Sequence, residues 1–419
     1  MRLKEPNARV TPGWGRRRLD VIHNLKLTLC LSAALSTTTA FAQLTSTDEH
    51  TQAEPSSSSV AYVYVANTPA NSKTNEIVAY RAASDGSLSP VAGSPFPENV
   101  YSMAVNGKYL MSANTSKPDI DAFKIESDGA LTYAASTNYQ KNDYGCGSAG
   151  PIFFDHTGAT LYVMEFNGSN ACANTVYASY AVVKATGGLK YLGMDNTGAF
   201  PGSYNAASFI GNNVYAYTAE DSACMYYLIY GFERKTNGLL NGFSVKYNLP
   251  PPPKGVRGYI PALAAADPTD HVAFTMQPAD PPGCAAGPLQ LASYTADAMG
   301  NLNTTNTHSN MPATLISDPN DLKMSPSGKL LAVGGQQGLQ IFHFNGASPI
   351  THYTNLLTSD PITQMFWDNN NHLYAISQST GKLFVFTITP TGHQEAPGSP
   401  YTINSPQAII VQPLPLKEE

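Results

Sequence analysis

Two carboxylates stand at the ends of apolar strands, where a side chain can leave a protein core and meet a ligand. Glu165 follows the apolar run 161–164, and Asp321 directly precedes Leu322 at the start of another apolar run. Two carboxylates at one site can bind a cation, or they can act as an acid and a base on a substrate. The commoner alternative is that both are solvated or hydrogen-bonded groups on a polar surface.

Other polar side chains are expected beside these acids in the folded chain. They are Asn320, Tyr144, Tyr259 and Arg257. Amide, phenol and guanidinium groups of this kind orient a ligand by hydrogen bonds.

The histidine and glycine patterns add no further chemistry. The nine histidines show no metal-ligand spacing, and the chain has neither a phosphate-binding glycine loop nor a G-x-S-x-G motif. We therefore predict neither a metal nor a cofactor. Three histidines, His156, His271 and His372, fall in predicted turns on the opposite face, where we expect them at the surface.

The chain is built from a repeat whose marker is a turn followed by leucine. Its copies are Asp85-Gly86-Ser87-Leu88, Asp128-Gly129-Ala130-Leu131, Gly187-Gly188-Leu189, Asn237-Gly238-Leu239 and Gly300-Asn301-Leu302, with weaker copies at Asn345-Gly346 and Thr391-Gly392. Such dipeptides tolerate the positive φ angles of tight hairpins, so each marker joins two antiparallel strands. Two further apolar strands precede each hairpin. Seven units of four strands, about 43–60 residues apart, predict an all-β, seven-bladed β-propeller.

The two ends of the chain complete one blade. The first unit starts with its second strand at residues 62–66, and the C-terminus ends with an extra apolar run at residues 407–411. We predict that this last run supplies the innermost strand of the first blade, which would close the ring and hide the sheet edges.

The turn pattern resembles that of the lactonase-like family of seven-bladed propellers, which includes 6-phosphogluconolactonases and a muconate-cyclising relative. Three further segments resemble the same family: the strand exit Gly93-Ser94-Pro95-Phe96, its repeat at Gly398-Ser399-Pro400-Tyr401, and the strand at residues 62–67. The resemblance covers nearly all of residues 60–412. It implies the propeller fold and lactone chemistry at one mouth of the channel, with Glu165 and Asp321 at positions that are often acidic in relatives.

Basic residues of that family are missing here at three places. In the fifth blade Ala262 and Leu263 stand where the resemblance implies Arg and His, and the third blade has Ala149-Gly150-Pro151 at the equivalent place. In the sixth blade Gln336 stands where relatives often show Arg. The resemblance therefore implies an incomplete active site with little to hold an anionic sugar lactone.

The N-terminus is typical of an export signal. A basic region at residues 16–18 precedes an apolar stretch, and Ala40-Phe41-Ala42 fits a cleavage site. We predict a signal peptide at residues 1–42, a flexible linker at 43–59, the propeller at 60–412 and a tail at 413–419. The destination is periplasmic or extracellular, and no membrane span remains after the signal is removed.

Four cysteines lie beyond the signal, and an even number in an exported chain indicates two disulfides. They are Cys146, Cys172, Cys224 and Cys284. The repeat places all four on one face. Of the three connectivities, we prefer Cys146 with Cys172 and Cys224 with Cys284.

The charge balance limits the partners. Seven of the 24 basic and two of the 30 acidic residues lie in the signal, which leaves 17 basic and 28 acidic residues and a net charge of −11. So acidic a surface excludes nucleic acid as a partner and leaves a small molecule or an extracytoplasmic protein or glycan. We expect a monomer.

Three functions fit these observations. The first is an exported propeller that binds a ligand or partner and has a degenerate active site. The second is a hydrolase of a small, neutral lactone with Glu165 and Asp321 as acid and base. The third is a repeat scaffold at the cell surface. The sequence does not decide whether the protein is an enzyme.

Overall fold

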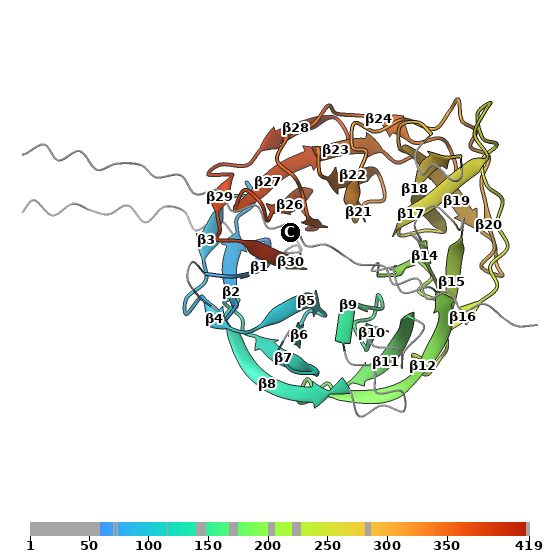
Figure 1. Ribbon diagram of the computed structural model, residues 1–419. Coiled ribbons are helices and arrows are strands. Elements are labelled where there is room, and N and C mark those ends of the chain that lie inside the picture. The colour runs from blue at the N-terminus through green and yellow to red at the C-terminus, as the bar shows by residue number, and fades with distance from the viewer. Residues whose placement is uncertain are drawn as a thin grey trace, which may run out of the picture. The chain divides into compact units, whose positions relative to one another are not determined.

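The computed structural model describes residues 59–69, 72, 74–114, 116–139, 148–166, 175–199, 206–219, 228–280 and 286–415. They belong to one compact unit, Pro55–Glu419. Within these ranges the chain forms strands and no helix, so none of the described residues provides a helix that could cross a membrane. Seven antiparallel sheets stand around a common axis as the blades of a β-propeller (Figure 1), which confirms the predicted fold class.

The first three blades contain the candidate site. Blade 1 consists of β1 (Ala61–Asn67), β2 (Glu76–Ala82), β3 (Leu88–Pro90) and β30 (Pro406–Pro413), with β4 (Phe96–Pro97) paired to β2. Blade 2 consists of β5 (Val100–Val105), β6 (Tyr109–Asn114), β7 (Asp119–Ile125) and β8 (Leu131–Asn138). Blade 3 consists of β9 (Ser148–Phe154), β10 (Thr160–Phe166), β11 (Thr175–Val182) and β12 (Leu189–Ala199).

The other four blades follow in chain order. Blade 4 consists of β13 (Ser208–Phe209), β14 (Tyr215–Ala219), β15 (Ile229–Arg234) and β16 (Leu240–Phe243). Blade 5 consists of β17 (Gly258–Ala266), β18 (His271–Ala279), β19 (Gln290–Ala296) and β20 (Leu302–Asn303). Blade 6 consists of β21 (Pro319–Met324), β22 (Leu330–Gly335), β23 (Gly338–His343) and β24 (Thr351–His352). Blade 7 consists of β25 (Gln364–Trp367), β26 (His372–Ser377), β27 (Lys382–Thr389) and β28 (Gly392–Glu395), with β29 (Tyr401–Thr402) paired to β27.

The ring closes as the sequence predicts. Strand β30 pairs antiparallel with β1, Val63 lying opposite Val411, and so becomes the innermost strand of blade 1. The first and last strands of the propeller therefore share one sheet, and neither leaves an exposed edge toward its neighbour.

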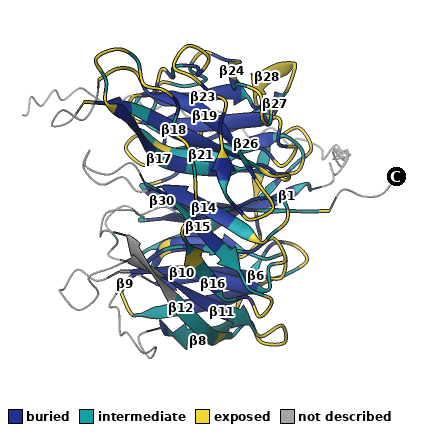
Figure 2. Ribbon diagram, turned by 90° about the vertical axis from the view of Figure 1, so that its right-hand side faces the viewer, coloured by how far each residue is buried: buried dark blue, intermediate teal, exposed yellow. Residues whose placement is uncertain are grey.

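The second strands of four blades are buried along their whole length because both faces of each blade pack on neighbouring blades. Every residue of β1, β6, β22 and β26 is buried. Figure 2 shows the same trend, with buried residues in the inner strands and exposed residues in the turns. Continuous apolar strands of this kind are typical of sheets covered on both faces.

The expectation that His372 lies at the surface is wrong. Its side chain is 1% exposed, and Nδ1 lies 2.7 Å from Oδ2 of Asp368, which also accepts a hydrogen bond of 2.9 Å from the Tyr374 hydroxyl. The His372 ring lies beside Gly86 in a turn of blade 1, so this histidine at the beginning of β26 is part of the interface between blades 7 and 1. His156, by contrast, is exposed as expected.

Candidate active site

The channel has two ends that differ in what lines them. The innermost strands begin at one end of the channel, which we call the upper mouth. They stop at the other end, the lower end, where the turns into the second strands follow. Innermost strands of neighbouring blades contact one another around the channel, including β30 with β5 and β5 with β9. Residues just before or at the beginning of each innermost strand therefore share the upper mouth.

A β-bulge recurs at the beginning of the innermost strand in five blades. In blade 2, Val100 lies opposite Asn114 and Ser102 opposite Ala113, so Tyr101 is the extra residue. The corresponding extra residues elsewhere are Gln407 in blade 1, Gly150 and Pro151 in blade 3, Ala262 and Leu263 in blade 5, and Asn320 in blade 6. Bulges re-aim side chains and are frequent beside active sites.

The residues at these bulges carry no charge. Tyr101 is 45% exposed and Asn320 is also exposed, so both are accessible at the upper mouth. The bulges of blades 3 and 5 hold Gly150, Pro151, Ala262 and Leu263. Amide, phenol and aliphatic groups favour an uncharged ligand over an anion.

Glu165 lies inside the protein rather than at the rim. Its residue exposure is 0%, and its carboxylate accepts a hydrogen bond of 3.0 Å from the Tyr180 hydroxyl. Leu161 and Val163 lie on the same face of β10 as Glu165, and both belong to the core cluster between blades 2 and 3. Tyr139 of blade 2 has a raised pKa, mainly because of burial and in smaller part because of the Glu165 charge.

Asp321 connects two blades. Its Oδ2 accepts a hydrogen bond of 2.7 Å from the backbone N–H of Met365 in blade 7, and its Oδ1 lies 3.3 Å from Lys323 Nζ. In the same way, Ser102 Oγ accepts a hydrogen bond from the backbone N–H of Ile152, and Gln364 Oε1 accepts one from that of Ile409. Each of these bonds reaches the innermost strand of the next blade. Neighbouring Asn320 donates a hydrogen bond of 2.7 Å to the Ile362 carbonyl.

Two of the other predicted site residues, Tyr259 and Arg257, lie in or next to blade 5 and not beside these acids. Tyr259 is fully buried in blade 5, and burial raises its pKa to about 12. Arg257 has a 72% exposed side chain and pairs with Asp280 at 3.4 Å. Glu165 and Asp321 themselves stand on blades 3 and 6, on different sides of the ring (Figure 1). Tyr144 and the cysteines Cys146, Cys172, Cys224 and Cys284 lie outside the described residues.

A polar cluster that the sequence analysis missed stands at the upper side of blade 2. Glu98 precedes β5, Asn114 ends β6, and Asp121 lies near the start of β7. The Asn114 amide donates to Glu98 Oε1 at 2.9 Å and to Asp121 Oδ2 at 3.2 Å. Lys117 Nζ lies 3.1 Å from Asp121 Oδ2 and 3.3 Å from Asp119 Oδ2. One amide thus bridges two carboxyl groups, with an ammonium group beside them.

Asp121 changes the proton affinity of Glu98. Burial, the negative charge of Asp121 and a hydrogen bond between the two side chains raise the pKa of Glu98 to about 7. Asp121 is 1% exposed, whereas Glu98 is only partly buried. A carboxyl group that titrates near neutrality and remains accessible can take up or release a proton at physiological pH.

One sequence signal could have revealed this pair. In β7 the alternation of residues 120–125 places Asp121 on a buried position, and a charge there requires a partner. Glu98 gives no such signal, because it lies on a loop and meets Asp121 only when blade 2 has formed.

A second polar network contains an exposed histidine. Nδ1 of His308 lies 2.9 Å from the Tyr259 hydroxyl and 3.0 Å from Gln290 Oε1. His308 belongs to the loop from β20 to β21, which leads to the upper mouth in blade 6. An exposed imidazole is thus part of a second hydrogen-bond network on this side of the propeller.

These groups include a proton acceptor and a cation. A carboxylate of the pair can accept a proton from water, and the Lys117 ammonium can stabilise an oxyanion. No group of three or more metal-ligating side chains occurs among the residues that the structure describes.

The comparisons with known proteins agree on the fold. No family model matches the sequence, and no curated protein matches it either. Solved structures do match. A "putative 6-phosphogluconolactonase" from Bacteroides uniformis superposes with a TM-score of 0.63 at 14% identity, covering 84% of this chain and 100% of that one. The protein of the same description from Bacteroides fragilis gives 0.61 at 13% identity, covering 85% and 99%.

A third similar structure is the periplasmic gluconolactonase PpgL of Pseudomonas aeruginosa. It superposes with a TM-score of 0.60 at 14% identity, covering 85% of this chain and 100% of that one. Such identities establish the architecture but not the chemistry. In its fold, this chain is a seven-bladed β-propeller that is similar to these three structures.

Proposed function

We propose that the protein binds a small, uncharged lactone at the upper mouth and hydrolyses it with the Glu98–Asp121 pair. The observation that supports catalysis is the accessible carboxyl group of Glu98, whose pKa is raised to about 7 beside Asp121. The uncharged bulge residues, among them Tyr101 and Asn320, support a neutral substrate.

The step uses one water molecule. The deprotonated carboxylate accepts a proton as the water oxygen attacks the lactone carbonyl carbon, and the resulting oxyanion is stabilised by the Lys117 ammonium. The tetrahedral intermediate then collapses, the ring C–O bond breaks, and the proton passes to the leaving alkoxide. The product is a hydroxy acid, and the pair returns to its initial protonation state.

The test is hydrolysis of δ-valerolactone, dihydrocoumarin and glucono-δ-lactone by the purified protein, followed as acid release. We expect Glu98→Gln to lower kcat at least 100-fold, in line with the loss of a general base. The matched control is Glu126→Gln, because Glu126 pairs with Lys124 outside the cluster and should be replaceable without loss. Turnover should rise with pH through an apparent pKa near 7, since the base must be deprotonated.

A variant of His308 distinguishes the role of the Glu98–Asp121 pair from that of the Tyr259–His308 network. If His308→Asn abolishes turnover while Glu98→Gln does not, the Tyr259–His308 network carries the chemistry and the proposed role of Glu98 is wrong.

The second candidate function is ligand binding without turnover, in line with a degenerate site. It is favoured by Glu165 and Asp321, which both make hydrogen bonds within the fold. Calorimetric binding of an intact lactone with no acid release would support it. We further propose that residues 1–42 direct export. A mature chain that starts at Gln43 outside the cytoplasm, shown by mass spectrometry, would support this proposal.

A further inference from the structure

The side-chain amide of Asn114 has hydrogen-bond partners on both of its sides. Its Nδ2 donates to Glu98 at 2.9 Å and to Asp121 at 3.2 Å. Its Oδ1 accepts hydrogen bonds of 2.8 Å from both the backbone N–H and the hydroxyl of Ser116, and one of 3.3 Å from the backbone N–H of Lys117. An amide has two N–H groups and an oxygen with two lone pairs, so the bonding capacity of this side chain is filled.

The contacts of Oδ1 fix the direction of Nδ2. Backbone N–H groups need an acceptor, so the amide oxygen must face residues 116 and 117. The NH₂ group, on the other side of the planar amide, must then face the two carboxyl groups. Only 8% of Asn114 is exposed, so water has little access to replace these partners. One side chain therefore connects the carboxyl pair to the loop that carries the Lys117 ammonium.

Glu98 depends on this contact because it lies on a loop. Its backbone N–H donates to the Asn75 carbonyl of blade 1 at 3.3 Å, which holds the main chain but not the carboxyl group. The ionisable groups that act on the carboxyl group are Asp121, whose negative charge repels an ionised Glu98, and Lys117. Donation from one amide to both carboxyl groups offsets this repulsion.

Blade 1 has the same residue type at the corresponding place with different contacts. Asn67 is the last residue of β1, and its Nδ2 donates to Glu76 Oε1 at 3.3 Å. Its buried Oδ1 has no hydrogen-bond partner among the described residues. The blade fold thus places an amide here without requiring it to bridge carboxyl groups, so the bridge made by Asn114 is a property of the site in blade 2.

We infer that Asn114 is a positioning residue. It holds the Glu98 carboxyl group against Asp121 and, through the same amide, fixes the loop that places the Lys117 ammonium. The inference rests on the proposed hydrolysis by the Glu98–Asp121 pair, and it adds the residue that assembles this pair. Asn114 acts through geometry, since a base accepts a proton efficiently only from a water molecule that is held at hydrogen-bond distance.

The test replaces Asn114 with serine, whose hydroxyl can still accept hydrogen bonds from residues 116 and 117 but is too short to reach both carboxyl groups. Without the bridge, the Glu98 carboxyl group turns away from Asp121 into solvent. Its pKa should then fall from about 7 toward the ordinary value of 4.5. We expect kcat to fall at least about tenfold and KM to change less than about twofold, because the buried Asn114 does not touch the substrate.

The pKa is followed by ¹³C NMR of protein labelled at the glutamate carboxyl carbons. The Glu98 signal is the one that is absent from the spectrum of Glu98→Gln. This readout needs no turnover, and a merely structural role of Asn114 would not move it.

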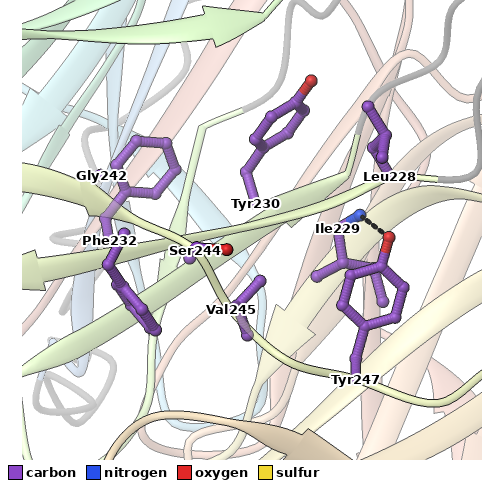
Figure 3. A pocket seen from close by; sticks show the side chains of 10 residues that line it. Leu228, Ile229, Tyr230, Phe232, Gly242, Ser244, Val245 and Tyr247 are labelled. Atoms are coloured by element: carbon purple, nitrogen blue, oxygen red, sulfur yellow. Dashed lines mark hydrogen bonds between the residues drawn. The ribbon is translucent and has the colours of Figure 1, made fainter.

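Two controls separate positioning from the general loss of a hydrogen bond. Asn67→Ser is the same exchange in blade 1, next to Glu76. Tyr247→Phe removes a hydroxyl that accepts a hydrogen bond of 3.4 Å from Ile229 N–H, beside a cavity of about 540 Å³ at the edge of blade 4 (Figure 3). None of the residues lining that cavity is charged. Both variants should leave the Glu98 titration unchanged and kcat within about twofold of the wild type.

The outcomes distinguish this inference from the proposed function. A lowered Glu98 pKa in Asn114→Ser supports the inference even if no lactone is hydrolysed. An unchanged or raised pKa in Asn114→Ser shows that the amide does not position Glu98, and the inference is then wrong even if Glu98→Gln lowers kcat. Should Asn114→Ser not fold, Ser116→Ala removes an exposed donor to the same oxygen. It should lower the Glu98 pKa in smaller measure, and no change there would equally contradict the inference.

Discussion

The Tyr64 hydroxyl of blade 1 donates a hydrogen bond of 2.9 Å to the carbonyl oxygen of Gly129, in the turn between β7 and β8 of blade 2. The same contact, a second-strand tyrosine on the turn glycine of the next blade, recurs twice. Tyr162 bonds to Gly238 and Tyr217 to Gly300, each at 2.9 Å. The repeated glycine turn is therefore a hairpin and also an acceptor for the preceding blade.

Replacing Tyr64 with phenylalanine tests the contribution of this hydrogen bond. The ring stays packed in a site with 0% exposure, but the hydroxyl is lost and the Gly129 carbonyl loses its donor. We expect the free energy of unfolding in urea to fall by about 1–2 kcal/mol. Tyr133→Phe is the control, because Tyr133 is 59% exposed, and its effect should stay below about 0.5 kcal/mol. Equal effects of the two variants would refute the role of the bond.

The turn glycines are also required by space. Gly129 has a φ of +88°, and a Cβ at this position would lie 2.5 Å from the ring of Tyr62. Gly107 has a similar φ of +90°, but no atom lies within 4 Å of its added Cβ. We expect Gly107→Ala to cost about 1–2 kcal/mol for the backbone conformation alone, and Gly129→Ala to cost about 1–3 kcal/mol more. Thermal melts of both variants measure the difference. Equal losses of stability would show that the Tyr62 ring moves aside at no cost.

The Asp155–Arg234 pair connects the turn of blade 3 to the third strand of blade 4. The distance from Nε to Oδ2 is 2.7 Å, and the Asp155 side chain is 0% exposed. Arg234→Met leaves a buried carboxylate without its cation, so we expect a loss of about 3–5 kcal/mol. Adding Asp155→Asn should recover at least half of that loss, because it removes the charge. A double-mutant cycle by urea unfolding measures this coupling, and simple additivity would contradict it.

Glu98 should make stability depend on pH in a defined window. Its pKa is raised from 4.5 to about 7 in the folded protein, so the folded state holds its proton more tightly than the unfolded state. The stabilisation is complete below pH 4.5 and disappears as the pH rises to about 7. Because Glu98 is partly exposed, we expect about 1–2 kcal/mol rather than the full conversion of the shift.

The measurement compares wild type with Glu98→Gln between pH 4 and 8. The stability of the variant relative to the wild type should increase across pH 4.5–7 and stay constant above that range. A difference that does not change with pH would show that Glu98 titrates normally. This outcome would also remove the main support for its role as a base.

The sequence by itself was enough to predict the fold and its closure. Glycine turns, strand lengths and apolar runs are local properties, and seven copies of the same pattern leave few alternatives to a propeller. The extra strand at the C-terminus follows in the same way, because the first unit lacks one strand and the last run has no other partner.

The candidate site depended on contacts between residues far apart in the sequence. Glu98 meets Asp121, and Tyr259 meets His308, only after loops and strands have been brought together in the blades. His372 was expected at the surface because its sequence neighbourhood is a turn, yet packing of blade 1 against blade 7 buries it. The repeated pattern of glycine turns and apolar runs thus determined the architecture of this protein. Only the tertiary structure decided which charges are buried, paired or exposed, because burial and electrostatic contact are set by neighbours in space rather than by neighbours in the chain.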